Sequence, residues 1–89
     1  MGAVSMVNFS FQPQVLNILP GEVVTWTNND TATHTTTSDT GIWDSGELAP
    51  GQSFSFGFTE GGEFGYHCAI HPSMTGTISA GPPVAEPGD

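Results

Sequence analysis

Short segments in which apolar and polar residues alternate predict β-strands along most of this chain. Residues 4–11 alternate in this way, with Val7, Phe9 and Phe11 on one face, and we expect a single half-buried strand here. Further strands are predicted at residues 15–19, 23–28, 34–38, 53–58, 63–68 and 75–80.

Glycine and proline mark the turns between these segments. Pro20–Gly21 predicts a hairpin that joins 15–19 to 23–28, and Gly61–Gly62 predicts a turn before 63–68. No segment requires a helix. Seven or eight short strands at this spacing predict an all-β fold, an antiparallel Greek-key β-sandwich.

The same alternation predicts which side chains face the core. The phenylalanines of 53–58 share one face, which we expect to be buried. In the next strand Phe64, Tyr66 and Cys68 fall on the inward side, whereas His67 falls on the opposite side. We therefore expect Cys68 to be buried and His67 to be a surface histidine.

Chain length limits the protein to a single domain. At 89 residues the chain can build one modest core, which we assign to residues 1–80. Residues 81–89 contain three prolines and few apolar side chains, so we expect a disordered tail or linker there.

Charge excludes two classes of partner. The chain has no Lys or Arg and nine Asp and Glu residues, giving a formal charge of -9. This charge argues against binding to nucleic acid or to anionic membranes, and no run of apolar residues is long enough to span a bilayer. A partner protein with a basic docking surface is expected instead.

Soft metal ligands are concentrated in one short segment. The lone cysteine, Cys68, is followed by His71 and Met74 at intervals of three residues. Thiolate and imidazole bind copper in both oxidation states, and a thioether is a soft additional ligand. His34, in a Thr-rich loop, would supply a second imidazole if the sandwich brings the ends of two distant strands together. The set predicts one copper ion that cycles between Cu(II) and Cu(I).

Three segments resemble the cupredoxins, most closely the group that contains amicyanins, pseudoazurins and plastocyanins. The resemblance covers almost the whole chain. It rests on residues 20–28 (PGEVVTWTN) followed by His34, on residues 48–54 (LAPGQSF), and on the C-x2-H-x2-M spacing from Cys68 to Met74, which is similar to the short ligand loop of amicyanins.

This resemblance implies a type 1, or blue, copper site. His34, Cys68 and His71 would lie in a plane around the metal, with Met74 as a weak axial ligand. The implied function is that of a one-electron carrier between redox partner proteins, without enzymatic activity. A monomer is expected.

The resemblance also implies how the electron leaves and where the protein works. The exposed edge of His71 would be the exit, with Ile70 and Pro72 as an apolar docking surface. Many relatives have Asn after the first histidine, where it ties the two ligand loops together, whereas this chain has Thr35. Because cupredoxins work outside the cytoplasm, we expect a periplasmic or otherwise extracytoplasmic protein, a mature chain with an added start residue.

Other functions are compatible with parts of this pattern. Copper buffering or metallochaperone activity without electron transfer is the main alternative, although an inward-facing thiolate should slow metal release. A zinc site would use the His and Cys ligands but gains little from Met74. A cysteine nucleophile would need an orienting acid and an oxyanion site, which the sequence around Cys68 does not suggest. The chain is also compatible with being one domain of a larger protein.

Overall fold

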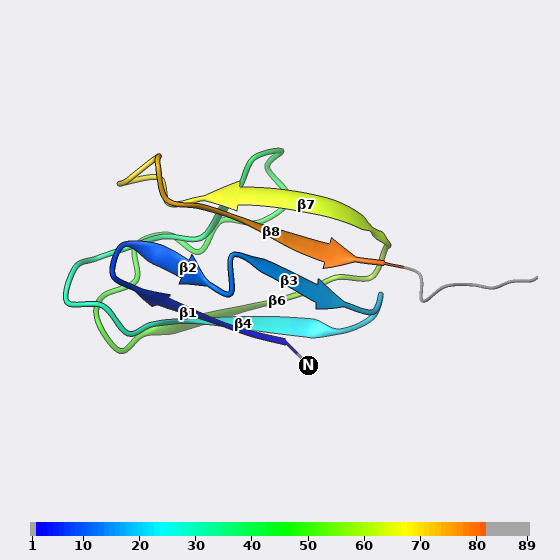
Figure 1. The fold of residues 1–89 in the computed structure, drawn as a ribbon, viewed down its shortest axis with the longest axis horizontal. Helices are drawn as coiled ribbons and strands as arrows, with labels where there is room; N and C mark the ends of the chain where they lie inside the picture. The colour runs from blue at the N-terminus through cyan, green and yellow to red at the C-terminus, as the bar shows by residue number, and fades with distance from the viewer. Residues whose placement is uncertain (1, 82–89) are drawn as a thin grey trace, which may run out of the picture.

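Two four-stranded β-sheets pack face to face in this protein (Figure 1). The computed structural model describes residues 2–81, so the predicted tail lies outside the described residues except for Gly81. The strands are β1 (Gly2–Val7), β2 (Ser10–Gln12), β3 (Val15–Ile18), β4 (Val23–Asn28), β5 (Thr37–Ser38), β6 (Ser53–Gly57), β7 (Gly62–His67) and β8 (Thr75–Ala80). One sheet has the order β2-β1-β4-β6 and the other the order β3-β8-β7-β5. In this part of the chain no helix is long and apolar enough to cross a membrane.

The predicted all-β sandwich is confirmed, and its sheets are mixed. β1 pairs with β4 in parallel and β3 pairs with β8 in parallel, whereas the remaining pairs are antiparallel. The predicted hairpin between 15–19 and 23–28 is wrong, because the turn at Pro20–Gly21 carries the chain from one sheet to the other. Turn residues specify only that the chain changes direction. Which strands pair is decided by packing, since Ile18 on β3 and Val24 on β4 are both buried in the core between the two sheets.

The first predicted strand is in fact a tight hairpin. Asn8 and Phe9 have φ values of 53° and 56°, in the left-handed region that Asn adopts more readily than most residues. Their turn ends β1 and starts β2, so the expected shared face of Val7, Phe9 and Phe11 does not form. Met6 is buried opposite Phe11, while Phe9 is 52% exposed at the tip of the turn.

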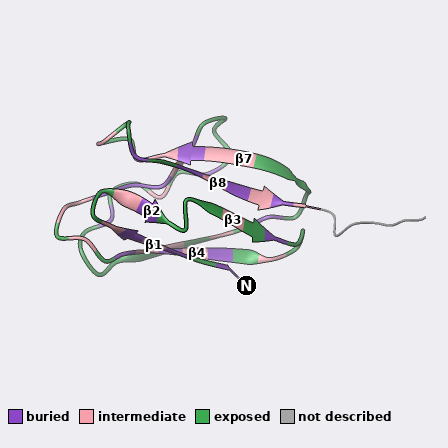
Figure 2. Cartoon of the chain, viewed as in Figure 1, coloured by how far each residue is buried: buried purple, intermediate pink, exposed green. Residues whose placement is uncertain are grey.

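Aromatic rings fill the space between the sheets. Trp26 on β4 is fully buried and stacks on Trp43 at a centroid distance of 5.5 Å. The phenylalanines of 53–58 face this core as predicted, with Phe54 and Phe56 packed against it and Phe58 fully enclosed. Every second residue of β1, β4 and β8 is buried, as the period of two requires. Figure 2 shows buried stretches on strands of both sheets.

Two connections meet at one end of the sandwich. The loop that follows β4 and the loop between β7 and β8 lie together at the left-hand end in Figure 1. The last described residues of β8 lie at the opposite end. The predicted ligands His34 and Cys68 are thereby placed at the same pole.

Candidate metal centre

Three predicted ligands converge at this pole from two loops. The Nδ1 atoms of His34 and His71 each lie 3.7 Å from Sγ of Cys68. One ligand atom from each of these residues lies within 4.8 Å of the other two. His34 and Cys68 are fully buried although they are 34 residues apart in sequence, and His71 is half-buried.

This donor set fits a copper ion. Two imidazole nitrogens and one thiolate are the equatorial donors of type 1 centres. Burial raises the pKa of the Cys68 thiol, but hydrogen bonding to the sulfur, first of all from the Thr35 backbone N–H, lowers it to about 6. The metal-binding thiolate is therefore the main form at neutral pH.

Backbone hydrogen bonds close the loop that carries Cys68, His71 and Met74, three of the four predicted ligands. The N–H of Cys68 donates to the carbonyl oxygen of Met74 at 3.0 Å, and the N–H of Met74 donates to that of His71 at 2.9 Å. These bonds bring the two ends of the loop together at the point where β7 gives way to β8. The loop thereby folds back on itself, with the Cys68 sulfur and a His71 ring nitrogen close together.

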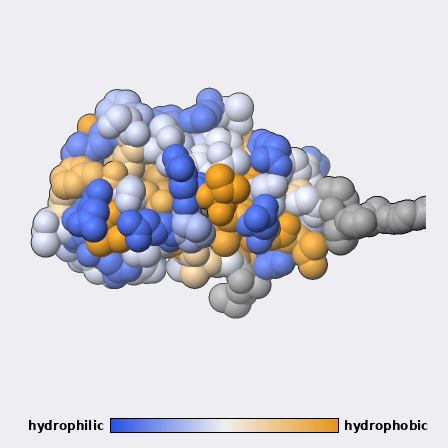
Figure 3. Space-filling view, in the orientation of Figure 1, coloured by the Kyte–Doolittle hydropathy of each residue, from blue (hydrophilic) through white to orange (hydrophobic). Residues whose placement is uncertain are grey.

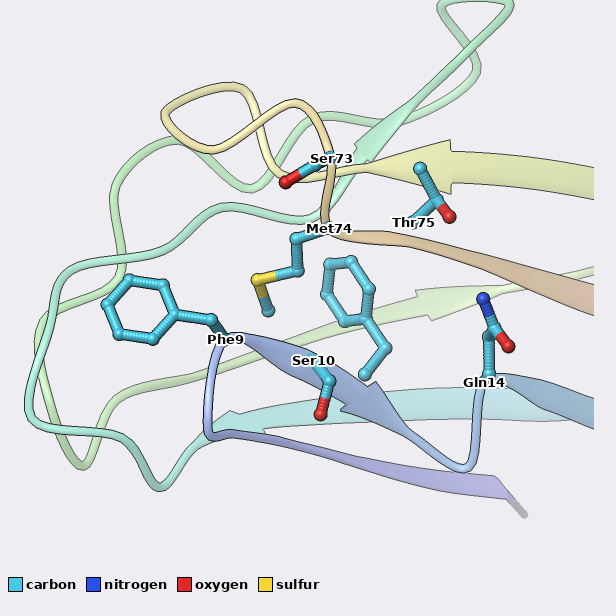
Figure 4. A pocket seen from close by; sticks show the side chains of 7 residues that line it. Phe9, Ser10, Gln14, Ser73, Met74 and Thr75 are labelled. Carbon is cyan, nitrogen blue, oxygen red and sulfur yellow. The ribbon is translucent and has the colours of Figure 1, made fainter.

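Met74 lies at the end of the loop that carries Cys68 and His71, and it is buried. Its side chain is 3% exposed and extends from the start of β8 toward Phe9 (Figure 4). It lines a pocket of about 200 Å³ that opens next to the centre. The remaining lining residues come from the first hairpin and its exit and from the start of β8: Phe9, Ser10, Phe11, Gln14, Ser73 and Thr75.

Thr35 connects the two ligand loops through two different atoms. Its backbone N–H donates to Sγ of Cys68 at 3.3 Å. Its hydroxyl oxygen accepts a hydrogen bond from the backbone N–H of Ala69 at 2.8 Å. The Thr35 hydroxyl thus links the two loops.

Asp30 and Phe9 also belong to this centre, and sequence reasoning missed both. Oδ2 of Asp30 lies 2.9 Å from Nε2 of His34 and accepts a hydrogen bond from the Phe9 backbone N–H, also at 2.9 Å. The hydrogen bond with His34, followed by that with Phe9, lowers the pKa of the Asp30 carboxyl. The Phe9 ring is edge-on to both imidazoles, at centroid distances of 5.2 Å from His34 and 4.8 Å from His71.

The sequence offered little signal for either residue. Asp30 precedes His34 by four residues, a spacing that brings side chains together in a helix but has no set meaning in a loop. The alternating pattern assigned Phe9 to the core, because it gave no indication of the turn at residues 8 and 9.

The remaining histidine is a surface residue, as predicted. Nδ1 of His67 lies 2.6 Å from Oδ1 of Asp39, and the two side chains are 31% and 55% exposed. His67 is adjacent to Cys68 in sequence but points to the other face of β7. It is not part of the cluster of metal-ligating atoms.

Known proteins resemble this chain over nearly its whole length. The family model described as "Copper binding proteins, plastocyanin/azurin family" matches residues 2–81. The chain is 29% identical over 80 residues to amicyanin from Paracoccus denitrificans, covering 84% of this chain and 61% of that protein. It is 35% identical over 82 residues to plastocyanin from Scenedesmus fuscus, covering 78% of this chain and 84% of that protein.

A solved structure shares the fold as well. The structure described as "Novel Purple Cupredoxin from Nitrosopumilus maritimus" superposes with a TM-score of 0.85 at 27% sequence identity, covering 91% of this chain and 100% of that chain. The present chain spans just 61% of the length of the amicyanin above, so that protein contains additional sequence.

Proposed function

Because this chain belongs to the plastocyanin/azurin family of copper-binding proteins, we propose that it carries single electrons between redox partner proteins. His34, Cys68, His71 and Met74 would hold the metal. Bound copper supplies a reversible one-electron couple between Cu(II) and Cu(I). The observation that carries the proposal is the convergence of two imidazole nitrogens and one thiolate sulfur in a site whose innermost ligands are fully buried.

The protein's own contribution is to hold the donors still and keep water away. His34 and Cys68 have no exposed surface, and the two ligand loops are linked by the hydrogen bonds of Thr35. Ligands fixed in this way need little rearrangement when the charge of the centre changes. A metallochaperone, by contrast, must release its metal to a partner, which buried and hydrogen-bonded ligands disfavour.

Electron exchange would take place through His71. Its ring is half-buried, and its neighbours Ile70 and Phe9 are 42% and 52% exposed. On the face drawn in Figure 3, the left-hand end that carries the ligand loops shows moderately apolar residues interspersed with hydrophilic ones. The side chains of Ile70, Phe9 and the exposed Pro72 form an apolar docking surface around the edge of the His71 imidazole.

The net charge of -9 suits a partner with a basic surface. Opposite charges speed the encounter of two proteins, whereas the apolar contact fixes their final orientation. We place the protein in an extracytoplasmic compartment and expect it to act as a monomer, as its family membership suggests.

A copper titration with matched variants tests the ligand set. Cu(II) added to the apo protein is expected to give an intense thiolate-to-copper absorption band and a small copper hyperfine splitting in electron paramagnetic resonance. Cys68→Ser is expected to abolish both signals. His67→Asn serves as the control, because it removes the neighbouring histidine that lies outside the cluster, and it is expected to leave both signals unchanged.

Met74 is tested separately in the same assay. Met74→Leu is expected to keep the intense band, because the other three donors remain, and to change the reduction potential. An unchanged potential would exclude Met74 as a ligand. Weak, ordinary Cu(II) signals from the unmutated protein would contradict the electron-carrier proposal and favour copper buffering or another metal.

A further inference from the structure

The first histidine of the centre is bonded to a carboxylate on the side that faces away from Cys68. Oδ2 of Asp30 lies 2.9 Å from Nε2 of His34. The side chain of His34 is completely buried and that of Asp30 is 11% exposed, so this contact is shielded from water. The Asp30 carboxylate, the His34 imidazole and the metal-binding position therefore follow one another in space.

Other hydrogen bonds hold the Asp30 carboxylate itself in place. Its Oδ1 accepts from the backbone N–H of Thr31 at 2.9 Å. Its own backbone N–H donates to Oδ1 of Asn28 at 3.0 Å. Asn28 is fully buried and its Nδ2 donates to the carbonyl oxygens of Ala32 and Leu48, at 2.8 Å each. Asp30 is therefore a fixed acceptor at the end of β4 rather than a mobile surface acid.

The position of this acceptor determines which nitrogen of His34 can bind a metal. A carboxylate at Nε2 requires the proton of the neutral imidazole to reside there, which leaves the Nδ1 lone pair free. Nδ1 is the atom that faces Sγ of Cys68 at 3.7 Å. A carboxylate partner also makes the imidazole a more basic ligand than a neutral partner would.

The same carboxylate oxygen orders a second part of the centre. Oδ2 of Asp30 accepts a hydrogen bond from the backbone N–H of Phe9. The backbone of Phe9 lies in the left-handed region, with φ at 56°. The Phe9 ring is half exposed, so core packing does little to fix it, yet it meets both imidazoles edge-on. Its position against His34 and His71 therefore depends on the anchoring of this turn.

We infer that Asp30 is the positioning residue of the metal centre, fixing His34 with Nδ1 toward the metal and holding Phe9 over the two imidazoles. This inference rests on the proposed function, since it concerns the ligands of the same copper ion. A negative charge next to the imidazole stabilises Cu(II) more than Cu(I). Asp30 therefore lowers the reduction potential and strengthens Cu(II) binding.

The chain offers a matched pair of variants for the test. Asp30→Asn and Asp39→Asn each remove one negative charge from an aspartate that is bonded to a histidine, but Asp39 is paired with His67 outside the centre. Asp30→Asn is expected to weaken Cu(II) binding by about 10-fold to 100-fold, the usual cost of removing an outer partner of a metal ligand. Cu(I) binding should weaken less and the potential should rise, whereas Asp39→Asn should change these values little.

A nuclear magnetic resonance measurement on the apo protein tests the inference without copper. In the unmutated protein His34 is expected to populate one neutral tautomer, protonated at Nε2. In Asp30→Asn this preference should weaken. Because the first measurement needs no variant, it decides the tautomer even if Asp30→Asn fails to fold.

Three results would overturn the inference: equal effects of Asp30→Asn and Asp39→Asn on copper affinity, equal weakening of Cu(II) and Cu(I) binding in Asp30→Asn, or a His34 protonated at Nδ1 in the apo protein. A protein that shows the expected tautomer but no intense thiolate band would retain the role of Asp30 in placing His34 and lose the proposed electron-carrier function.

Discussion

Single residues in this centre act through the backbone as much as through their side chains. Thr35 is the clearest case, because its backbone N–H donates a hydrogen bond to the Cys68 sulfur and its hydroxyl oxygen accepts one from the backbone N–H of Ala69. The sulfur contact needs no particular side chain at residue 35, whereas the link to Ala69 needs a hydrogen-bond acceptor there. The two contributions can therefore be separated by mutation.

Thr35→Val should remove the link between the loops and keep the contact with sulfur. The variant preserves side-chain shape but leaves the Ala69 N–H without its acceptor, so we expect a loss of about 1 kcal/mol in the free energy of unfolding. Copper should also dissociate faster, while the thiolate band remains. Urea denaturation and metal release to a chelator measure these effects, with Thr35→Ser as the control that retains the hydroxyl. Equal stability and equal release rates for the two variants would show that the hydroxyl has no such role.

At the scale of elements, the contact between β7 and β8 depends on a residue without a side chain. Tyr66 and Gly76 are paired across these strands. A Cβ atom at Gly76 would lie 2.6 Å from the Tyr66 ring, a distance that real Cβ atoms do not reach. The glycine thus makes room for the buried tyrosine two residues before Cys68.

Gly76→Ala should therefore strain the pair of strands that carries the ligand loop. We expect a loss of about 1–3 kcal/mol in unfolding free energy, the usual cost of overpacking a tight core. Gly57→Ala on β6 is the control, because the nearest atom to its Cβ would be a Val23 carbon at 3.8 Å. Its effect should stay within about 0.5 kcal/mol, as for most exposed substitutions. The midpoint of denaturant unfolding is measured for both variants. Similar midpoints for Gly76→Ala and Gly57→Ala would contradict the steric explanation.

For the molecule as a whole, charge opposes the compact state. With nine acidic residues and no Lys or Arg, carboxylates have no cationic side chain other than histidine to pair with. His34 and His67 each form a hydrogen bond with one aspartate, but the formal net charge is still -9, so repulsion among the acidic residues is screened mainly by solvent and salt. Self-repulsion of this kind destabilises a folded protein at low ionic strength.

Salt should accordingly stabilise the fold at neutral pH. Raising the sodium chloride concentration from about 0.01 M to about 0.5 M shortens the screening length several-fold, so the urea midpoint is expected to rise. The same series at a pH near 4, where many carboxylates are protonated, is the control and should show a smaller rise. A midpoint that is independent of salt at neutral pH would mean that the acidic side chains are too far apart to repel one another.

The sequence by itself determined features that depend on neighbouring residues. The period of two along 63–68 put Cys68 inside and His67 outside, and the burial of these residues agrees. The spacing of Cys68, His71 and Met74 indicated a compact ligand loop, because each donor lies three positions after the previous one. Strands in which every second residue faces the core, such as 23–28 and 75–80, were predicted with the same first and last residues as in the structure.

Only the tertiary structure decided which distant segments meet. The turn at Asn8 and Phe9 broke an apparently continuous strand, and packing between the sheets replaced the predicted hairpin with parallel neighbours. The contact of Asp30 with His34 and Phe9 likewise depends on how the loop after β4 folds against the first hairpin. Periodicity and spacing report on adjacent residues along one chain. Contacts between segments arise from burial in a shared core, which no single segment of the sequence specifies.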